Sequence, residues 1–173
     1  MTGTAEKIIT FLLAKTGSGL LFDLTEHKAK RTLTQNAYYW VLLEKVAEAV
    51  RISKPELHNL LLRQYGVLQR IDGKAIAAFI ADTDSAENEA LRAETFHLRP
   101  TSVTKEGAQG TMRQYVLLKG SHDMTTTEMA ALLDGLILEA KQLGIETLPP
   151  AELERMRAYE ASKNKSNSNS EGS

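Results

Sequence analysis

The stretch RTLTQNAYYW, residues Arg31–Trp40, decides the fold expected for this chain. It opens with a cation, carries the adjacent amides Gln35 and Asn36, and ends in three consecutive aromatic residues. Thr34 belongs to the residue types preferred at a helix N-cap, so the stretch predicts a helix that runs to about Arg51. Its apolar surface is broad, which predicts burial on more than one side, in a core or against a second subunit.

Outward from this helix, hairpin and helix signals alternate. A capping box starts a helix at Ser53, and a second box starts another at Thr125. Asp72-Gly73 is a strong hairpin signal. Strands are predicted over residues 7–14, 20–25, 67–71, 74–81, 95–105 and 111–118, with further short helices over 82–94 and 151–161. The predicted fold class is α+β, with antiparallel β-hairpins packed by helices.

The length and composition fit one globular domain. The chain has 173 residues, of which 42% are hydrophobic and 25% charged. We expect a single α+β domain over residues 1–161. Residues 162–173 are almost wholly polar and are expected to form a disordered tail.

The chain has no cysteine, which excludes disulfides, thiolate metal sites and a cysteine nucleophile. No apolar run approaches the ~20 residues of a membrane span. The apolar segment over 8–14 is short and predicts a buried strand, not a secretory signal. We therefore expect a cytoplasmic protein.

The net charge of −1 conceals two basic islands. One island lies over residues 27–31. The other lies over residues 95–119, where the acidic residue Glu106 is outnumbered by the cations Arg99, Lys105, Arg113 and Lys119. Such islands can bind phosphate while the whole molecule stays near neutral, although scattered solvated charges explain them equally well.

The histidines and acidic residues show no catalytic or metal-binding pattern. The four histidines are far apart in sequence, and neither a phosphate-binding glycine loop nor a nucleophile elbow is present. We expect no catalytic residue, no metal and no cofactor. His58-Asn59 is the single His-Asn pair that an HNH nuclease could use, and it falls in a predicted helix.

The predicted DNA-binding residues gather around the quoted stretch. Lys28, Lys30 and Arg31 can neutralise phosphates, and Gln35 and Asn36 can donate to phosphates or bases. Alternatively, the two amides satisfy local backbone groups. The predicted basic track continues with Arg99, Arg113 and Lys119. Alternatively, these three residues are ordinary exposed cations of strands. Trp40 either packs in the core or stacks on a base.

The quoted stretch fits the pattern R-[ST]-L-x-Q-N-x-x-x-W and resembles the phage NinB/Orf family of recombination-mediator proteins. The similarity spans roughly residues 18–157, including the late helix and the exit Gly144-Ile145. It implies an intertwined homodimer that binds single-stranded DNA, helps load a recombinase, cooperates with single-strand-binding protein and has no enzymatic activity. Only Arg31, Gln35, Asn36 and Trp40 carry over residue by residue. The 82–94 segment and the tail depart from the family.

The expected function is therefore that of a non-enzymatic accessory protein of DNA recombination. Two alternatives remain open on the sequence. Related amide-tryptophan patterns occur in phage HNH nucleases, and an adaptor that binds only proteins would also fit these residues.

Overall fold

The computed structural model describes the backbone of residues 5–19, 34–108 and 110–170, and the side chains within 8–19, 34–108 and 110–162. The chain forms two compact units, Met1–Arg31 and Thr32–Ser173. Over the described residues it has six helices and two small antiparallel sheets. The predicted α+β class is confirmed at this level. The intertwined homodimer stays a prediction, as do the predicted domain bounds.

The first unit contains helix α1, Ala5–Leu13, so the strand predicted over 7–14 is wrong. Ile8, Phe11 and Leu12 are half-buried, whereas Ile9 and Leu13 are exposed. This spacing of i, i+3 and i+4 is helical, and a short apolar run does not distinguish the two structures in advance.

A glycine-rich turn follows α1. Gly17 and Gly19 have φ values of 83° and 67°, which suit glycine because it lacks a Cβ. The strand predicted over 20–25 lies outside the described residues.

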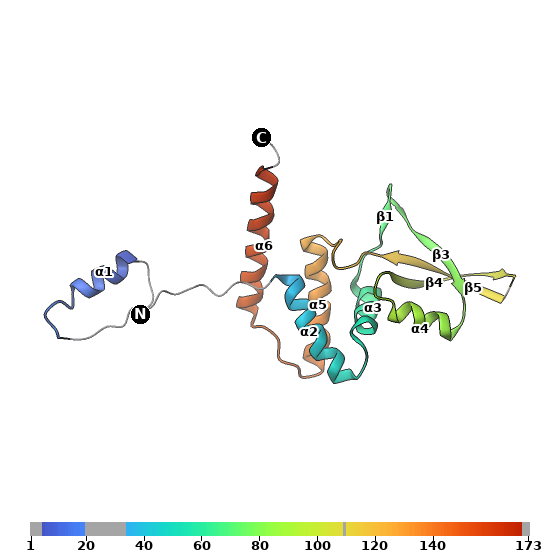
Figure 1. The fold of residues 1–173 in the computed structure, drawn as a ribbon, viewed down its shortest axis with the longest axis horizontal. Coiled ribbons are helices and arrows are strands. Elements are labelled where there is room, and N and C mark those ends of the chain that lie inside the picture. The colour runs from blue at the N-terminus through green and yellow to red at the C-terminus, as the bar shows by residue number, and fades with distance from the viewer. Residues whose placement is uncertain (1–4, 20–33, 109, 171–173) are drawn as a thin grey trace. The chain divides into compact units, whose positions relative to one another are not determined.

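The second unit has a helical layer with the main core (Figure 1). Its helices are α2 (Gln35–Val50), α3 (Lys54–Tyr65), α5 (Thr126–Gln142) and α6 (Pro150–Ser170). Helices α2, α3 and α5 pack through fully buried side chains such as Leu43, Leu62 and Leu136, and α6 adds Met156. The broad burial predicted for α2 is confirmed, because Tyr38, Leu42 and Leu43 on different parts of its surface are all buried.

The predicted helix starts are confirmed. The side chains of Thr34, Ser53 and Thr125 each accept a hydrogen bond from the backbone N–H three residues later. These bonds satisfy donors that the first helical turn leaves free. They explain why the boundaries of α2, α3 and α5 were predictable from local sequence.

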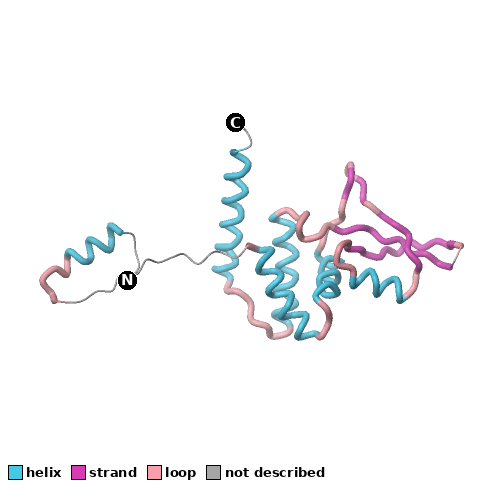
Figure 2. The backbone as a smooth tube through the Cα atoms, viewed as in Figure 1, coloured by secondary structure: helices cyan, strands magenta, loops and turns pink. Residues whose placement is uncertain are grey.

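The sheet layer contains a three-stranded antiparallel sheet in the order β3-β5-β4 (Figure 2). Its strands are β3 (Ala77–Ala81), β4 (His97–Gly107) and β5 (Gly110–Leu118). A separate hairpin pairs β1 (Arg70–Ile71) with β2 (Lys74–Ala75). At its turn Asp72 and Gly73 have φ of 50° and 76°, the double positive φ that a two-residue hairpin turn requires. Helix α4 is Asp84–Arg92.

Two helix ends differ from expectation. Gly66 ends α3, but with φ of −78° instead of the left-handed geometry that a C-terminal glycine usually adopts. Helix α6 continues to Ser170, beyond the predicted end at Ala161. Once a helix is nucleated, each added residue gains a backbone hydrogen bond, so a polar sequence can extend it. None of the helices described here combines the length and apolar character that a membrane crossing requires.

Candidate functional site

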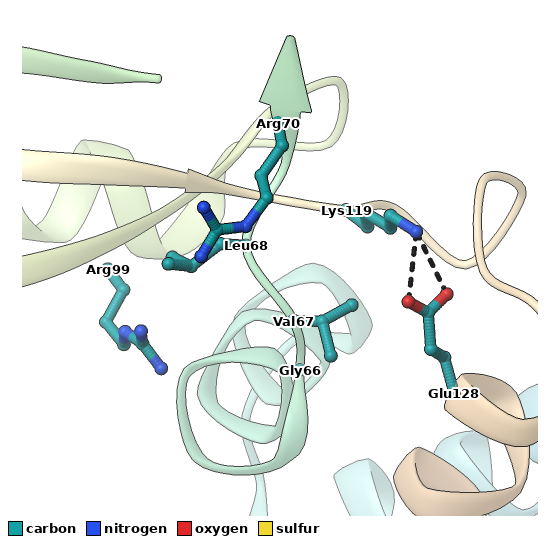
Figure 3. Close-up of a pocket in the computed structure, with 7 residues that line it drawn as sticks. All are labelled: Gly66, Val67, Leu68, Arg70, Arg99, Lys119 and Glu128. Carbon is teal, nitrogen blue, oxygen red and sulfur yellow. Dashed lines mark hydrogen bonds and ion pairs between the residues drawn. The ribbon is translucent and has the colours of Figure 1, made fainter. Parts of the chain in front are cut away.

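A cationic pocket of about 550 Å³ lies where the chain passes from α3 to the sheet. Its charged residues are Arg70 of β1, Arg99 of β4, Lys119 just after β5, and Glu128 in the first turn of α5. The segment Gly66–Leu68 completes the lining. Figure 3 shows Arg70 and Arg99 on one side of this space and the Lys119–Glu128 pair on the other.

Backbone pairing brings these elements together. After α3 the chain runs beside the end of β5, where Lys119 N donates to Val67 O at 2.9 Å and Gln69 N donates to Leu117 O at 2.9 Å. Gly66 permits this exit, because a Cβ there would lie 2.4 Å from Leu62 O. Any larger residue would have to move the end of α3, so the glycine is needed for close approach and not for a positive φ.

The pocket carries three cations against one carboxylate. Arg70 donates from Nη1 to Gly73 O at 2.7 Å, which fixes its guanidinium near the hairpin turn. Lys119 Nζ lies 3.0 and 3.1 Å from the two oxygens of Glu128. The side chain of Arg99 makes no hydrogen bond or ion pair with the described residues. The local charge is thus positive, with one guanidinium uncommitted in that part of the chain.

Glu128 has two roles. Its carboxylate accepts a hydrogen bond from Thr125 N at 2.8 Å, and Thr125 Oγ1 accepts one from Glu128 N, which completes the capping box of α5. The backbone N–H of Thr125, followed by Lys119, lowers the pKa of Glu128 below its usual range. Glu128 is therefore ionised at neutral pH and neutralises part of the pocket.

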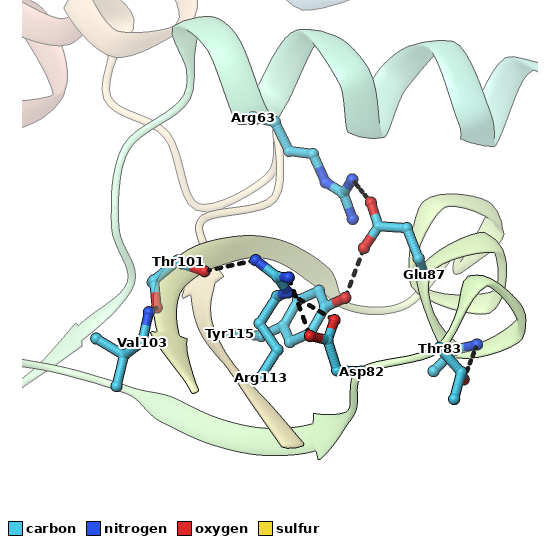
Figure 4. A network of polar contacts seen from close by, with 9 residues as sticks. Arg63, Asp82, Thr83, Glu87, Thr101, Val103, Arg113 and Tyr115 are labelled. Atoms are coloured by element: carbon cyan, nitrogen blue, oxygen red, sulfur yellow. Dashed lines mark hydrogen bonds and ion pairs between the residues drawn. The ribbon is translucent and has the colours of Figure 1, made fainter. Parts of the chain in front are cut away.

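The structure brings together two of the three strand cations predicted as a basic track, Arg99 and Lys119. Arg113 does not line this pocket. It forms a bidentate ion pair with Asp82, with atoms 2.7 and 3.0 Å apart, and donates to Thr101 O at 3.2 Å (Figure 4). These bonds occupy its guanidinium, so the sequence-based role of Arg113 as a ligand contact has no support in this conformation.

Arg113 instead belongs to a polar network that joins helices to the sheet (Figure 4). Tyr115 donates to Glu87 at 2.6 Å, and Arg63 pairs with the same carboxylate while donating to Leu98 O at 2.8 Å. Burial, followed by the bond to Glu87, raises the pKa of Tyr115 to about 12. The network fixes α4 against one face of the sheet and α3 along the edge of β4.

Few of the described side chains in the Arg31–Trp40 stretch are exposed to solvent. Lys28, Lys30 and Arg31 lie outside the described residues. Gln35 is 1% exposed, and its backbone N–H and its amide both donate to the carboxylate of Glu160 on α6. The alternative in which the amides satisfy local backbone groups is not what the structure shows for Gln35, because its amide bonds a distant side chain. Sequence could not foresee it because the two residues are 125 positions apart.

The neighbouring residues of the stretch are also largely enclosed. Asn36 is half-buried, and its Oδ1 has no hydrogen-bond partner among the described residues. Trp40 is partly buried and packs against the core, with its ring centroid 4.8 Å from that of His58. Packing of this kind is what the core alternative for Trp40 requires.

A buried histidine cluster lies beside Trp40. Tyr39 Oη is 2.7 Å from His58 Nδ1, and His97 Nδ1 is 2.7 Å from Asn59 Oδ1. Burial, then the nearby His97 and His122, lowers the pKa of His58 to about 3, and burial also lowers the pKa of His97. Both rings are therefore neutral at physiological pH.

The His58-Asn59 pair considered for a nuclease is built into this cluster. Asn59 Nδ2 donates to Leu91 O and Ala93 O, both at 2.8 Å, and so holds the end of α4. Helix α3 carries both residues of the pair. In the part of the chain that the structure describes, no group of three or more His, Asp or Glu residues is placed to hold a metal ion.

Sequence reasoning missed Arg70 and Glu128. Arg70 looked like an ordinary residue of a hairpin strand, and Glu128 like a helix-capping residue, which it also is. Comparisons with protein-family models, with curated proteins and with solved structures find no match to this chain. The function must therefore be argued from the site itself.

Proposed function

We propose that this chain is a non-enzymatic accessory protein of phage-type DNA recombination that binds single-stranded DNA. The observation that carries the proposal is the cationic pocket, in which Arg70, Arg99 and Lys119 converge around one space. Guanidinium and ammonium groups are the usual partners of phosphate oxygens. A pocket with three of them, of which Arg99 has no side-chain partner among the described residues, suits a phosphodiester backbone.

A nearly neutral protein can bind DNA in this way. The net charge is −1, so long-range attraction by the whole molecule is weak. Local cations still displace counterions from the phosphates that they contact, which gives salt-dependent affinity without sequence preference.

The sequence motif adds to the proposal but does not carry it. Lys28, Lys30 and Arg31 are proposed as further phosphate contacts. Gln35 is withdrawn as a direct contact because Glu160 occupies its amide. The resemblance to the NinB/Orf family supports the recombination role, the homodimer and the cooperation with single-strand-binding protein, all of which are proposals.

Fluorescence anisotropy with a labelled oligo-dT tests the proposal. The wild-type chain should bind at low salt, and Arg99→Gln should weaken binding severalfold. Arg92→Gln is the matched control, because Arg92 is an exposed arginine of α4 that does not line the pocket. No binding at low salt would reject the DNA-binding function and favour a protein-binding adaptor.

The same oligonucleotide tests the absence of enzymatic activity. We expect it to stay intact after incubation with the protein and Mg²⁺ or Mn²⁺. Cleavage that copurifies with the protein and is lost in His58→Ala would contradict the non-enzymatic role and favour a nuclease.

A further inference from the structure

We propose that one face of the β3-β5-β4 sheet is a platform on which a base of single-stranded DNA stacks, with Phe79 as the stacking residue. The inference rests on the proposed function and deepens it, because it assigns the bases a site beside the cationic pocket.

Strand register places the relevant side chains on one face. Directly opposed residues of antiparallel strands project to the same side of a sheet. Phe79 is opposite Gln114, while Val116 is opposite both Ala77 and Arg99. Lys105 is opposite Met112, and His97 is opposite Leu118. The shared face, which we call the platform face, therefore contains Ala77, Phe79, Ala81, His97, Arg99, Lys105, Met112, Gln114, Val116 and Leu118. Its His97–Leu118 end is buried against α3 and the core, so the part available to a ligand is the one around Phe79 and Lys105.

Helix α4 covers the opposite face. Tyr115, next to Gln114 in β5, points to α4, where its hydroxyl donates to Glu87. Helix α3 lies along the free edge of β4, where Arg63 donates to Leu98 O. Figure 1 shows α4 along one side of the sheet. On the platform face Ala77 and Lys105 are exposed, and Phe79 is half-buried.

The platform face offers an aromatic ring and cations together. Lys105 Nζ lies 4.0 Å from the centroid of the Phe79 ring. An exposed cation–π contact changes an equilibrium by roughly two- to fivefold, whereas base–aromatic stacking changes it by roughly five- to a hundredfold. A base can therefore displace the ammonium group from the ring, and the released Lys105 is then free to pair with a phosphate.

The platform face is continuous with the cationic pocket. Arg99 belongs to both, because it is opposite Val116 in the sheet and also lines the pocket. A strand whose phosphate binds Arg99 would have its neighbouring nucleotides over the sheet. Charge complementarity thus identifies the occupant as a single-stranded nucleic acid, which combines phosphates with unpaired bases.

Two probes of equal length separate base stacking from phosphate binding. One is oligo-dT, and the other is an abasic strand with the same number of phosphates. The wild-type chain should bind oligo-dT roughly five- to tenfold more tightly than the abasic strand. Phe79→Leu should reduce this preference severalfold, whereas Arg99→Gln should weaken both probes and preserve the ratio.

The matched control is Phe96→Leu, since Phe96 is 44% exposed and precedes β4 outside the platform face. It should keep the wild-type ratio. Phe79→Trp provides a readout that does not need a truncated side chain. Its fluorescence should be quenched by oligo-dT beyond the change that Trp40 alone gives in the wild-type chain.

Equal binding of both probes by the wild type would overturn the platform while leaving the DNA-binding function intact. An unchanged ratio in Phe79→Leu, or no extra quenching in Phe79→Trp, would overturn it as well. Failure of the wild type to bind either probe would reject both proposals together.

Discussion

Glu128 is the single residue that most directly controls the charge of the cationic pocket. Its carboxylate holds Lys119 Nζ at 3.0 and 3.1 Å, at the place that a ligand phosphate would take. A phosphate must therefore compete with Glu128 for this lysine. At the same time, the bond from Thr125 N keeps Glu128 anchored to α5.

We expect Glu128→Gln to bind oligo-dT severalfold more tightly than the wild type, because the amide removes one negative charge yet can still serve in a capping box. Anisotropy titrations of the two proteins at equal salt measure this. Glu44→Gln is the control, since Glu44 also pairs with a lysine, Lys54, at 2.9 Å and lies on α2 away from the pocket. Unchanged or weaker binding by Glu128→Gln would show that phosphate does not compete at Lys119.

The buried histidines make stability depend on pH. His58 has a pKa of about 3 in the folded chain, against an ordinary value of 6.5. Between these values the unfolded chain binds a proton that the folded chain does not, so stability is complete above pH 6.5 and falls as the pH decreases. The loss approaches about 1.4 kcal/mol per pH unit for such a group.

Urea unfolding should therefore show a free energy lower by about 1–2 kcal/mol at pH 5.5 than at pH 7.5. His58→Gln should reduce that difference, because it removes the main buried titrating group. His122→Gln should leave most of it, since His122 is exposed. If His58→Gln keeps the full pH dependence, other groups are responsible for it.

At the scale of elements, the packing of α3 on α5 depends on a missing side chain. Gly135 lies in the buried face of α5, and a Cβ there would meet Tyr65 Cδ2 at 2.4 Å. Tyr65 is held in place by its hydroxyl, which donates to Glu139 at 3.1 Å. Helix propensity and packing thus make opposite predictions for alanine at this position.

We expect Gly135→Ala to destabilise the chain by up to about 2 kcal/mol, because the overpacking cost of ~1–3 kcal/mol is offset by a propensity gain of only ~1 kcal/mol. Urea unfolding measures the change. In a Tyr65→Ala background the same substitution should stabilise, since only the propensity term remains. Stabilisation by Gly135→Ala in the otherwise wild-type chain would contradict the close packing.

The elements that sequence predicted well are those with local causes. Thr34, Ser53 and Thr125 cap their helices through bonds that span three residues, and Asp72-Gly73 fixes its own turn. The strand predicted in place of α1 was wrong because the short apolar run there has no helix cap or turn signal of this kind. No local sequence pattern predicts the bond between Gln35 and Glu160, because the two residues lie far apart in the chain.

At the scale of the whole molecule, the candidate site depends on topology more than on local charge. Arg99 and Lys119 were identified from the sequence, and the pairing of β4 with β5 brings them to one pocket. Arg113 was predicted as a DNA contact for the same reasons, but it forms an ion pair with Asp82, which is 31 positions away. Residue type alone could not distinguish a free cation from a paired one.

Arg70 reaches the pocket for a reason that is also non-local. The turn at Gly66 and the pairing of Val67–Gln69 with the end of β5 carry it there. Composition showed a molecule of net charge −1, whereas the fold gathers three cations and only one carboxylate at a single pocket. A binding function in such a molecule has to be local.

The most direct test of that local site is the salt dependence of oligo-dT binding. Each neutralised phosphate of a single strand contributes about 0.7 to the slope of log K against log salt. We predict that Arg70→Gln, Arg99→Gln and Lys119→Gln together lower the magnitude of the slope by about 2. The Arg92→Gln control should retain the wild-type slope. A triple variant that binds with the wild-type slope would contradict phosphate binding in the cationic pocket.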